Sequence, residues 1–184
     1  GQVSESAVKG SFKDADKINE LAKKLCQPGD ENKNIRRVIT VEIEHVDCDA
    51  MESIQSKDIP IYPSPATIRL IQDKYLQKEH MKNSNLNIPT SAFCVISNVE
   101  DGKKFGRKYG YPFMLKARTG AYDGKGNYVV KDVNDVENGV NALKPATLYA
   151  ESWCDFDREI AVMVLRGKDT DEPIRAYPVV EFSA

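Results

Sequence analysis

Apolar positions along the chain follow a helical spacing in some segments and an extended one in others, and together they predict a mixed α/β protein. In residues 14–25, DADKINELAKKL, apolar side chains recur at i, i+3, i+4 and i+7, which predicts an amphipathic helix. Residues 37–43, RVITVEI, are β-branched and mostly apolar, as is typical of a buried parallel strand. A helix that leads into such a strand favours an α/β layer.

The middle of the chain carries start and stop signals for helices. Ser64 before Pro65 is a favourable start, with serine as the N-cap and proline at the first helical position, so we expect a helix over residues 65–82. Two further elements are expected downstream: a strand over residues 90–96, and a short helix over residues 99–109 between the cap Asn98 and the stop Gly110.

The second half of the chain is dominated by extended patterns around one glycine-rich loop. Residues 112–118 alternate, with Met114, Lys116 and Arg118 on one side, and residues 127–132 form a second short strand pattern. The segment between them, TGAYDGKG, is too long for a tight hairpin turn. The remaining predicted elements are a helix over 134–144 with Asn134 and Glu137 in a capping-box arrangement, and strands within 146–152, 158–167 and 173–182.

Composition and charge narrow the class of protein. The 184 residues are 41% hydrophobic and 29% charged, and 26 Lys and Arg against 28 Asp and Glu give a formal net charge of −2. Such a near-neutral, mixed charge is typical of a soluble globular protein and gives no indication of nucleic-acid binding. No apolar run approaches the roughly 18–20 residues that a membrane span needs, so we expect neither nucleic acid nor membrane as a partner.

Cysteine and histidine are few and scattered. The four cysteines are Cys26, Cys48, Cys94 and Cys154, and no two of them lie at a CxxC spacing. With only 2 histidines, the sequence predicts neither a zinc site nor a disulfide framework, so we expect no metal ligands and free thiols that are buried or half-buried. This cysteine usage favours a cytoplasmic protein.

The loop TGAYDGKG is the first candidate for binding an anion. Its glycines, Gly120, Gly124 and Gly126, let the backbone approach a phosphate closely and present N–H groups to it, and Lys125 adds a positive charge. The spacing matches neither a P-loop nor a dinucleotide-binding turn, because Val129 stands where the latter needs its third glycine. A plain flexible connection between two strands is the alternative interpretation.

Charged residues at strand ends and within a strand are further candidates. Lys116 stands in an otherwise apolar strand, where a buried ammonium needs a partner such as an ATP phosphate, although it can also extend to the surface. Glu151 and Glu159 flank ESWCDFDRE, where carboxylates either accept ribose hydroxyls or form a solvated turn. Glu42 and Glu44 are expected on one side of the first strand, at its carboxyl end, where ligands gather in open α/β sheets.

Six segments, in this order and spacing, resemble one family. They are TVEIEHVD (40–47), YPSPATIRLIQDKYLQKEH (62–80), GYPFMLKARTGAYDGKGNYVV (110–130), LYAESW (148–153), REIAVMVLRG (158–167) and YPVVE (177–181). Over about residues 8–181 the chain is similar to the ATP-grasp part of the phosphoribosylaminoimidazole carboxylases. These are the ATP-dependent carboxyaminoimidazole ribonucleotide synthetases of purine biosynthesis, here in their fungal and plant form.

The resemblance implies an ATP-grasp fold of α/β type with an α+β lid, and it implies a reaction. The family uses ATP to activate bicarbonate, and aminoimidazole ribonucleotide then captures the carboxyl group. The products are carboxyaminoimidazole ribonucleotide, ADP and phosphate. The parent protein is expected to carry a fused mutase-type carboxylase domain, and a homodimer is the oligomeric state that the resemblance suggests.

The resemblance also assigns roles to individual residues. For ATP it implies Lys74 and Lys116 at the phosphates, the loop Ala121, Tyr122, Asp123, Gly124, Lys125, Gly126 and Asn127, the hinge Glu151, Ser152, Trp153 and Cys154 at the adenine, and Glu159 at the ribose. For aminoimidazole ribonucleotide and bicarbonate we expect Tyr122, Asp123, Lys125 and Glu44, with Glu42 and His45 as weaker candidates. Lys125 stands where many relatives have arginine, so the charge is kept but a bidentate fork is lost.

Relatives have an opening strand before the matching segments and continue well past residues 177–181. We therefore expect an ATP-grasp fold that is incomplete at both ends and a fragment that is inactive alone, with the Mg²⁺ ligands outside this chain. The expected domains are a partial pre-ATP-grasp domain (1–62), a linking helix with the start of the ATP-grasp region (63–112), the lid (113–150) and the start of the catalytic domain (151–184). The alternatives are another ATP-grasp ligase or carboxylase, or a non-catalytic lid fragment with a structural role only.

Overall fold

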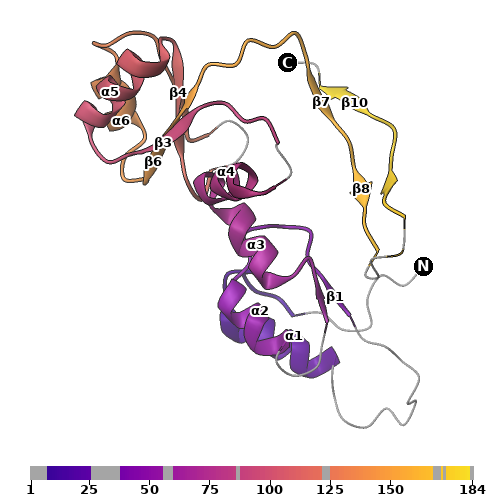
Figure 1. Cartoon of the computed structure of the whole chain (residues 1–184). Helices are drawn as coiled ribbons and strands as arrows, with labels where there is room; N and C mark the ends of the chain where they lie inside the picture. The colour runs from indigo at the N-terminus through magenta and orange to yellow at the C-terminus, as the bar shows by residue number, and fades with distance from the viewer. Residues whose placement is uncertain are drawn as a thin grey trace. The chain divides into compact units, whose positions relative to one another are not determined.

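The computed structural model describes residues 8–25, 38–55, 60–85, 88–121, 125–167, 171 and 173–182 (Figure 1). The chain divides into two units, Gly1–Ser152 and Trp153–Ala184. In these described segments no helix is long and apolar enough to cross a membrane.

The first unit begins with a small α/β layer. Its elements are α1 (Ala15–Leu25), β1 (Ile39–Thr40), α2 (Cys48–Gln55) and β2 (Ile61–Tyr62), and β1 pairs with β2 in parallel. Ala22 of α1, Met51 and Ile54 of α2 and Ile61 of β2 share one buried core. The apolar stripe predicted for the first helix is therefore confirmed.

The strand expected over 37–43 is shorter than predicted. Within the described residues only Ile39–Thr40 are extended, so Glu42 lies after the strand and Glu44 lies in a turn. The prediction that both carboxylates share one side of a strand is therefore wrong. The turn leads to α2, which was not predicted. It begins because Asp47 Oδ1 accepts the backbone N–H of Ala50 at 2.8 Å, as a helix cap does.

The helix expected over 65–82 is two helices, α3 (Pro65–Gln72) and α4 (Lys74–Asn83). The predicted start is confirmed, because the Ser64 side chain accepts the N–H of Thr67 at 3.2 Å. The break falls at Asp73, whose backbone is extended at φ −109° and ψ 102°. Its carboxylate caps α4 by accepting the N–H groups of Tyr75 at 3.0 Å and Leu76 at 3.1 Å.

The second part of the first unit is a four-stranded antiparallel sheet. Its strands, in spatial order, are β3 (Phe93–Ile96), β6 (Leu148–Ser152), β4 (Phe113–Ala117) and β5 (Asn127–Val130). In β4 the side chains of Phe113, Leu115 and Ala117 are buried, and those of Met114 and Lys116 on the opposite face are partly exposed. The predicted alternation is confirmed. The strands on either side of the loop, β4 and β5, pair in antiparallel fashion.

Two helices cover one face of this sheet, α5 (Val99–Tyr109) and α6 (Val136–Ala142). The predicted limits of α5 are confirmed: Asn98 Oδ1 accepts the N–H of Asp101 at 3.0 Å, and Gly110 ends the helix at φ +92°. The capping box expected at Asn134 is wrong. The N-cap of α6 is Asp135, and its carboxylate accepts the Tyr128 hydroxyl at 2.8 Å and the Lys131 N–H at 3.1 Å instead.

The opposite face of the sheet packs against α4 (Figure 1). The Tyr75 ring of α4 makes edge contacts with Phe93 of β3 and Tyr149 of β6, at centroid distances of 5.5 Å and 6.2 Å. Aromatic contacts of this kind hold α4 over the face formed by β3 and β6. The same helix therefore lies over the strand residues that were predicted to bind a ligand.

The second unit consists of two antiparallel ladders. Its strands are β7 (Glu159–Ala161) with β10 (Val180–Phe182), and β8 (Val164–Leu165) with β9 (Arg175–Ala176). The two strands expected over 158–167 and 173–182 are each interrupted.

The prediction of buried or half-buried free thiols is confirmed for two cysteines, Cys48, which is buried, and Cys94, which is half-buried. It is wrong for Cys154, which is exposed, and Cys26 lies outside the described residues.

Candidate functional site

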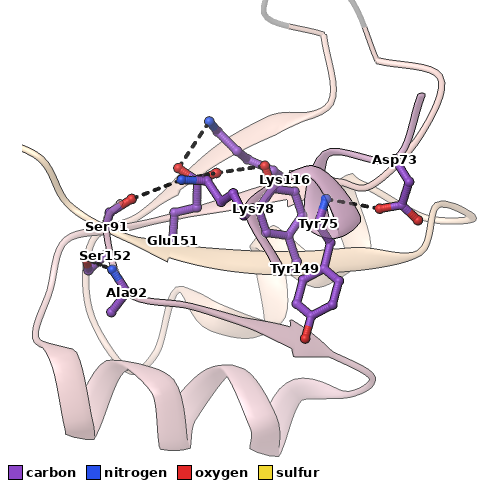
Figure 2. Close-up of polar contacts among 9 residues, drawn as sticks. All are labelled: Asp73, Tyr75, Lys78, Ser91, Ala92, Lys116, Tyr149, Glu151 and Ser152. Carbon is purple, nitrogen blue, oxygen red and sulfur yellow. Dashed lines mark hydrogen bonds and ion pairs between the residues drawn. The ribbon is translucent and has the colours of Figure 1, made fainter. Parts of the chain in front are cut away.

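The sheet face under α4 carries a cluster of charged side chains (Figure 2). Lys116 of β4 lies opposite Tyr149 of β6 in the strand register, and Glu151 follows two residues later on the same face of β6. Strand alternation thus brings Lys116 and Glu151 together on one face of the sheet. The amine of Lys116 is 3.4 Å from Glu151 Oε2.

Glu151 is the buried centre of this cluster. Its other oxygen, Oε1, accepts the Tyr149 hydroxyl at 2.7 Å and lies 3.5 Å from the amine of Lys78 on α4. The side chains of Lys78, Lys116 and Glu151 are 17%, 26% and 12% exposed. The strand lysine is therefore neither unpaired nor extended into solvent, because it shares a buried carboxylate with a second lysine.

Further hydrogen bonds fix the partners of this carboxylate. Lys78 also donates to Ser91 Oγ at 3.3 Å, just before β3. Burial and the hydrogen bond to the Glu151 carboxylate both raise the pKa of Tyr149, so its hydroxyl stays protonated and donates at neutral pH.

Neither Lys78 nor Tyr149 was predicted as a site residue. The signal for Lys78 was its position one helical turn after Lys74.

The start of α4 is tied to the strand end that leads into the glycine-rich loop. Arg118 holds Asp73 in a two-pronged ion pair, with Nη2 2.6 Å and Nε 3.1 Å from Asp73 Oδ2, and this pairing raises the pKa of the guanidinium. The Lys74 N–H donates to the Arg118 carbonyl at 2.9 Å, and the Lys74 amine donates to the Ala121 carbonyl at 3.2 Å. Lys74 therefore lies next to the first residues of the loop.

Two glycines in the described part of the loop have a left-handed backbone. Gly120 and Gly126 have φ values of +71° and +91°, which favour glycine over any residue with a Cβ. The Gly126 carbonyl accepts the Ala117 N–H at 2.8 Å, and Asn127 pairs with Lys116 across the ladder. Lys125 is exposed, and the predicted residues Tyr122, Asp123 and Gly124 lie outside the described residues.

The predicted hinge begins at the end of β6. Ser152 is held by two bonds to Ala92, from its N–H to the Ala92 carbonyl at 2.8 Å and from the Ala92 N–H to its Oγ at 3.1 Å. Trp153, Cys154 and Glu159 belong to the second unit, where all three are exposed.

The predicted substrate residue Glu44 lies in the small α/β layer. Its carboxylate is exposed and lies 3.7 Å from His45 Nε2, and its carbonyl accepts the side-chain amide of Gln72 at 2.6 Å. The last residue of α3 thus holds the turn that carries Glu44. Among the described residues, no three His, Cys, Asp or Glu side chains gather into a group that could hold a metal ion.

Family models match almost the whole chain in two parts. Residues 81–183 match the ATP-grasp domain, and residues 1–72 match the ribonucleotide synthetase preATP-grasp domain.

Individual relatives agree with the family-model matches. The chain is 47% identical over 176 residues to the phosphoribosylaminoimidazole carboxylase of Candida albicans, an alignment that covers 95% of this chain and 29% of the relative. The structure superposes on carboxyaminoimidazole ribonucleotide synthase from Aspergillus clavatus complexed with ATP, with a TM-score of 0.82, 39% identity and coverage of 97% of this chain and 43% of that one.

A second structure from Aspergillus clavatus is N5-carboxyaminoimidazole synthase in complex with ADP and 5-aminoimidazole ribonucleotide. It superposes with a TM-score of 0.81 at 36% identity, over 98% of this chain and 43% of that one. The chain therefore spans less than half the length of each of these three relatives.

Proposed function

Because the chain belongs to the ATP-grasp family, we propose that the sheet face between β4 and β6 binds the phosphates of ATP. The observation that carries the proposal is the position of the Lys116 amine. Lys116 lies on that face, opposite Asn127 at the far end of the glycine-rich loop, and its side chain is 26% exposed beside the buried carboxylate of Glu151. An ammonium held there, beside backbone N–H groups of a glycine-rich loop, suits a polyphosphate.

The reaction that we propose for the whole protein is the carboxylation of aminoimidazole ribonucleotide in purine biosynthesis. Bicarbonate attacks the γ-phosphorus of ATP and releases ADP, which leaves carboxyphosphate. The exocyclic amine of the ribonucleotide then attacks the carboxyl carbon, and phosphate departs. The support is the Aspergillus clavatus relative that is described as a complex with ADP and 5-aminoimidazole ribonucleotide.

Water is the main competitor of this chemistry, because carboxyphosphate hydrolyses readily. A loop that closes over the phosphates excludes water. The tie between Lys74 and Ala121, at 3.2 Å, holds the near end of that loop against α4.

The remaining residues take the roles that the family resemblance implies. Loop residues from Ala121 to Asn127 contact phosphates, the backbone of Glu151 to Cys154 recognises adenine, and Glu159 accepts ribose hydroxyls. Tyr122, Asp123, Lys125 and Glu44 serve the ribonucleotide and bicarbonate. For Mg²⁺, the resemblance implies ligands that lie outside this chain.

The setting of the whole protein is also part of the proposal. We expect a cytoplasmic enzyme, a homodimer, and a mutase-type carboxylase domain fused to the ATP-grasp part. The support for a further domain is length, since the aligned segment makes up 29% of the Candida albicans relative.

The first experiment measures nucleotide binding by the purified protein and by its Lys116→Met variant. We expect Mg-ATP to raise the melting temperature of the wild type and to bind the variant at least about tenfold more weakly, since a charge-assisted phosphate contact is lost. Lys17→Met is the matched control, because Lys17 is an exposed lysine on α1 that pairs with Glu20. An unchanged melting temperature in wild-type protein would refute nucleotide binding and favour a structural fragment.

The second experiment distinguishes the substrate. In a protein that contains this chain at the full length of its relatives, we expect ADP release to depend on both bicarbonate and aminoimidazole ribonucleotide. Release that instead requires formate, or biotin, would assign the chain to a different ATP-grasp ligase.

A further inference from the structure

We infer that Lys78 is a positioning residue for the nucleotide phosphates, which acts through Glu151 and never touches the nucleotide. This inference rests on the proposed function of Lys116. Lys78 keeps the Glu151 carboxylate paired, so that Lys116 is free to exchange that carboxylate for a phosphate.

The geometry gives each carboxylate oxygen its own ammonium. Lys78 lies 3.5 Å from Oε1 and Lys116 lies 3.4 Å from Oε2 (Figure 2). Tyr149 adds a hydroxyl donor to Oε1 at 2.7 Å. The two lysines come from different elements, α4 and β4, so one can move away without displacing the other.

Lys78 is also the better anchored of the two lysines. Its amine donates to Ser91 Oγ at 3.3 Å and lies 5.9 Å from the centroid of the Phe93 ring. Its side chain is 17% exposed, against 26% for Lys116. Lys116 is therefore the partner that an incoming anion can draw away from Glu151.

The charge balance explains why the second lysine matters. Two ammonium groups and one carboxylate carry a net charge of +1, so a phosphate meets a positive cluster. When Lys116 turns to the phosphate, Lys78 and Glu151 form a neutral pair. Without Lys78 the same exchange leaves a buried carboxylate without a cation next to an anionic ligand, which is costly.

The test compares ligands of different charge on purified wild-type protein and on Lys78→Met. We expect the variant to bind Mg-ADP about tenfold more weakly, which corresponds to about 1.4 kcal/mol, while adenosine binds equally well to both proteins. A merely structural role for Lys78 would weaken both ligands alike. Lys78→Arg keeps the charge, and we expect it to restore most of the ADP affinity.

The chain offers a matched control in Lys82, one turn further along α4. Its amine lies 5.7 Å from the same Phe93 ring, but its side chain is exposed. We expect Lys82→Met to bind ADP as the wild type does. The double variant Lys78→Met, Glu151→Gln removes the buried carboxylate that is left without a cation, so it should bind ADP more tightly than Lys78→Met alone.

The possible outcomes separate the two proposals. Wild-type protein that binds no ADP would overturn the proposed function itself. Wild-type protein that binds ADP, with Lys78→Met binding it equally well or losing adenosine in parallel, would overturn only the role of Lys78. Should Lys78→Met fail to fold, the comparison of Lys78→Arg with Lys78→Gln carries the same test.

Discussion

At the scale of single residues, the site depends on how a buried carboxylate is satisfied. Glu151 accepts one hydroxyl and lies beside two ammonium groups, and all three donors come from separate positions in the sequence. A sequence pattern shows that Lys116 needs a partner but cannot show which one, because the partner depends on sheet register. Lys78 and Tyr149 were missed for that reason, and the pairing of Lys116 with Glu151 was visible only in the structure.

Tyr149→Phe tests this view of Glu151 directly. The variant keeps the ring contact with Tyr75 and removes only the buried hydroxyl donor, so we expect a loss of about 1.5 kcal/mol in the free energy of unfolding. Urea denaturation measures the change. Tyr62→Phe, at an exposed ring, is the control and should change the stability little. Equal effects of the two substitutions would mean that the bond to Glu151 contributes nothing.

At the scale of elements, local signals predicted the starts of α3 and α5, and side chains that bond across the fold changed other elements. Ser64 and Asn98 behave as predicted because a cap bonds to its own helix. Asp73 and Asp135 do not follow the local pattern. Asp73 bonds to Arg118 and breaks a helix, and Asp135 bonds to Tyr128 and takes over the cap expected at Asn134.

Asp73 serves two elements at once, and two substitutions separate its contributions. Asp73→Asn keeps an N-cap for α4 but loses the ion pair with Arg118, whereas Asp73→Ala loses both. We expect losses of about 2 kcal/mol and about 3 kcal/mol in the free energy of unfolding. Calorimetric or urea unfolding measures both. A stability of Asp73→Asn equal to that of the wild type would show that the ion pair does not hold α4 to the loop.

Asp135 predicts a pH dependence for the start of α6. The Lys131 N–H and the Tyr128 hydroxyl lower the pKa of Asp135 in the folded protein. Its contribution to stability is therefore present above the unfolded pKa and is lost as the pH falls through the folded value. Unfolding curves of wild type and Asp135→Asn should differ at neutral pH and converge in acid. A constant difference across that range would contradict this assignment.

At the scale of the whole molecule, the family resemblance predicted the fold family, which the hydrophobic pattern alone could not identify. Periodicity predicted a mixed α/β chain, and the ATP-grasp family is confirmed by the match over residues 81–183. The four expected domain limits and the individual ligand roles stay predictions. The role expected of Glu159 rests on the family resemblance, because the local pattern left a solvated turn as the alternative.

The central claim is that Lys116 meets the phosphates of ATP, and lysine footprinting tests it most directly. The protein is treated with an acylating reagent with and without Mg-ATP, and the modification of each lysine is measured by mass spectrometry. We expect ATP to slow the modification of Lys116 several-fold and to leave that of the exposed Lys17 on α1 unchanged. Modification of Lys116 at the same rate with saturating ATP as without it would show that Lys116 does not contact the phosphates.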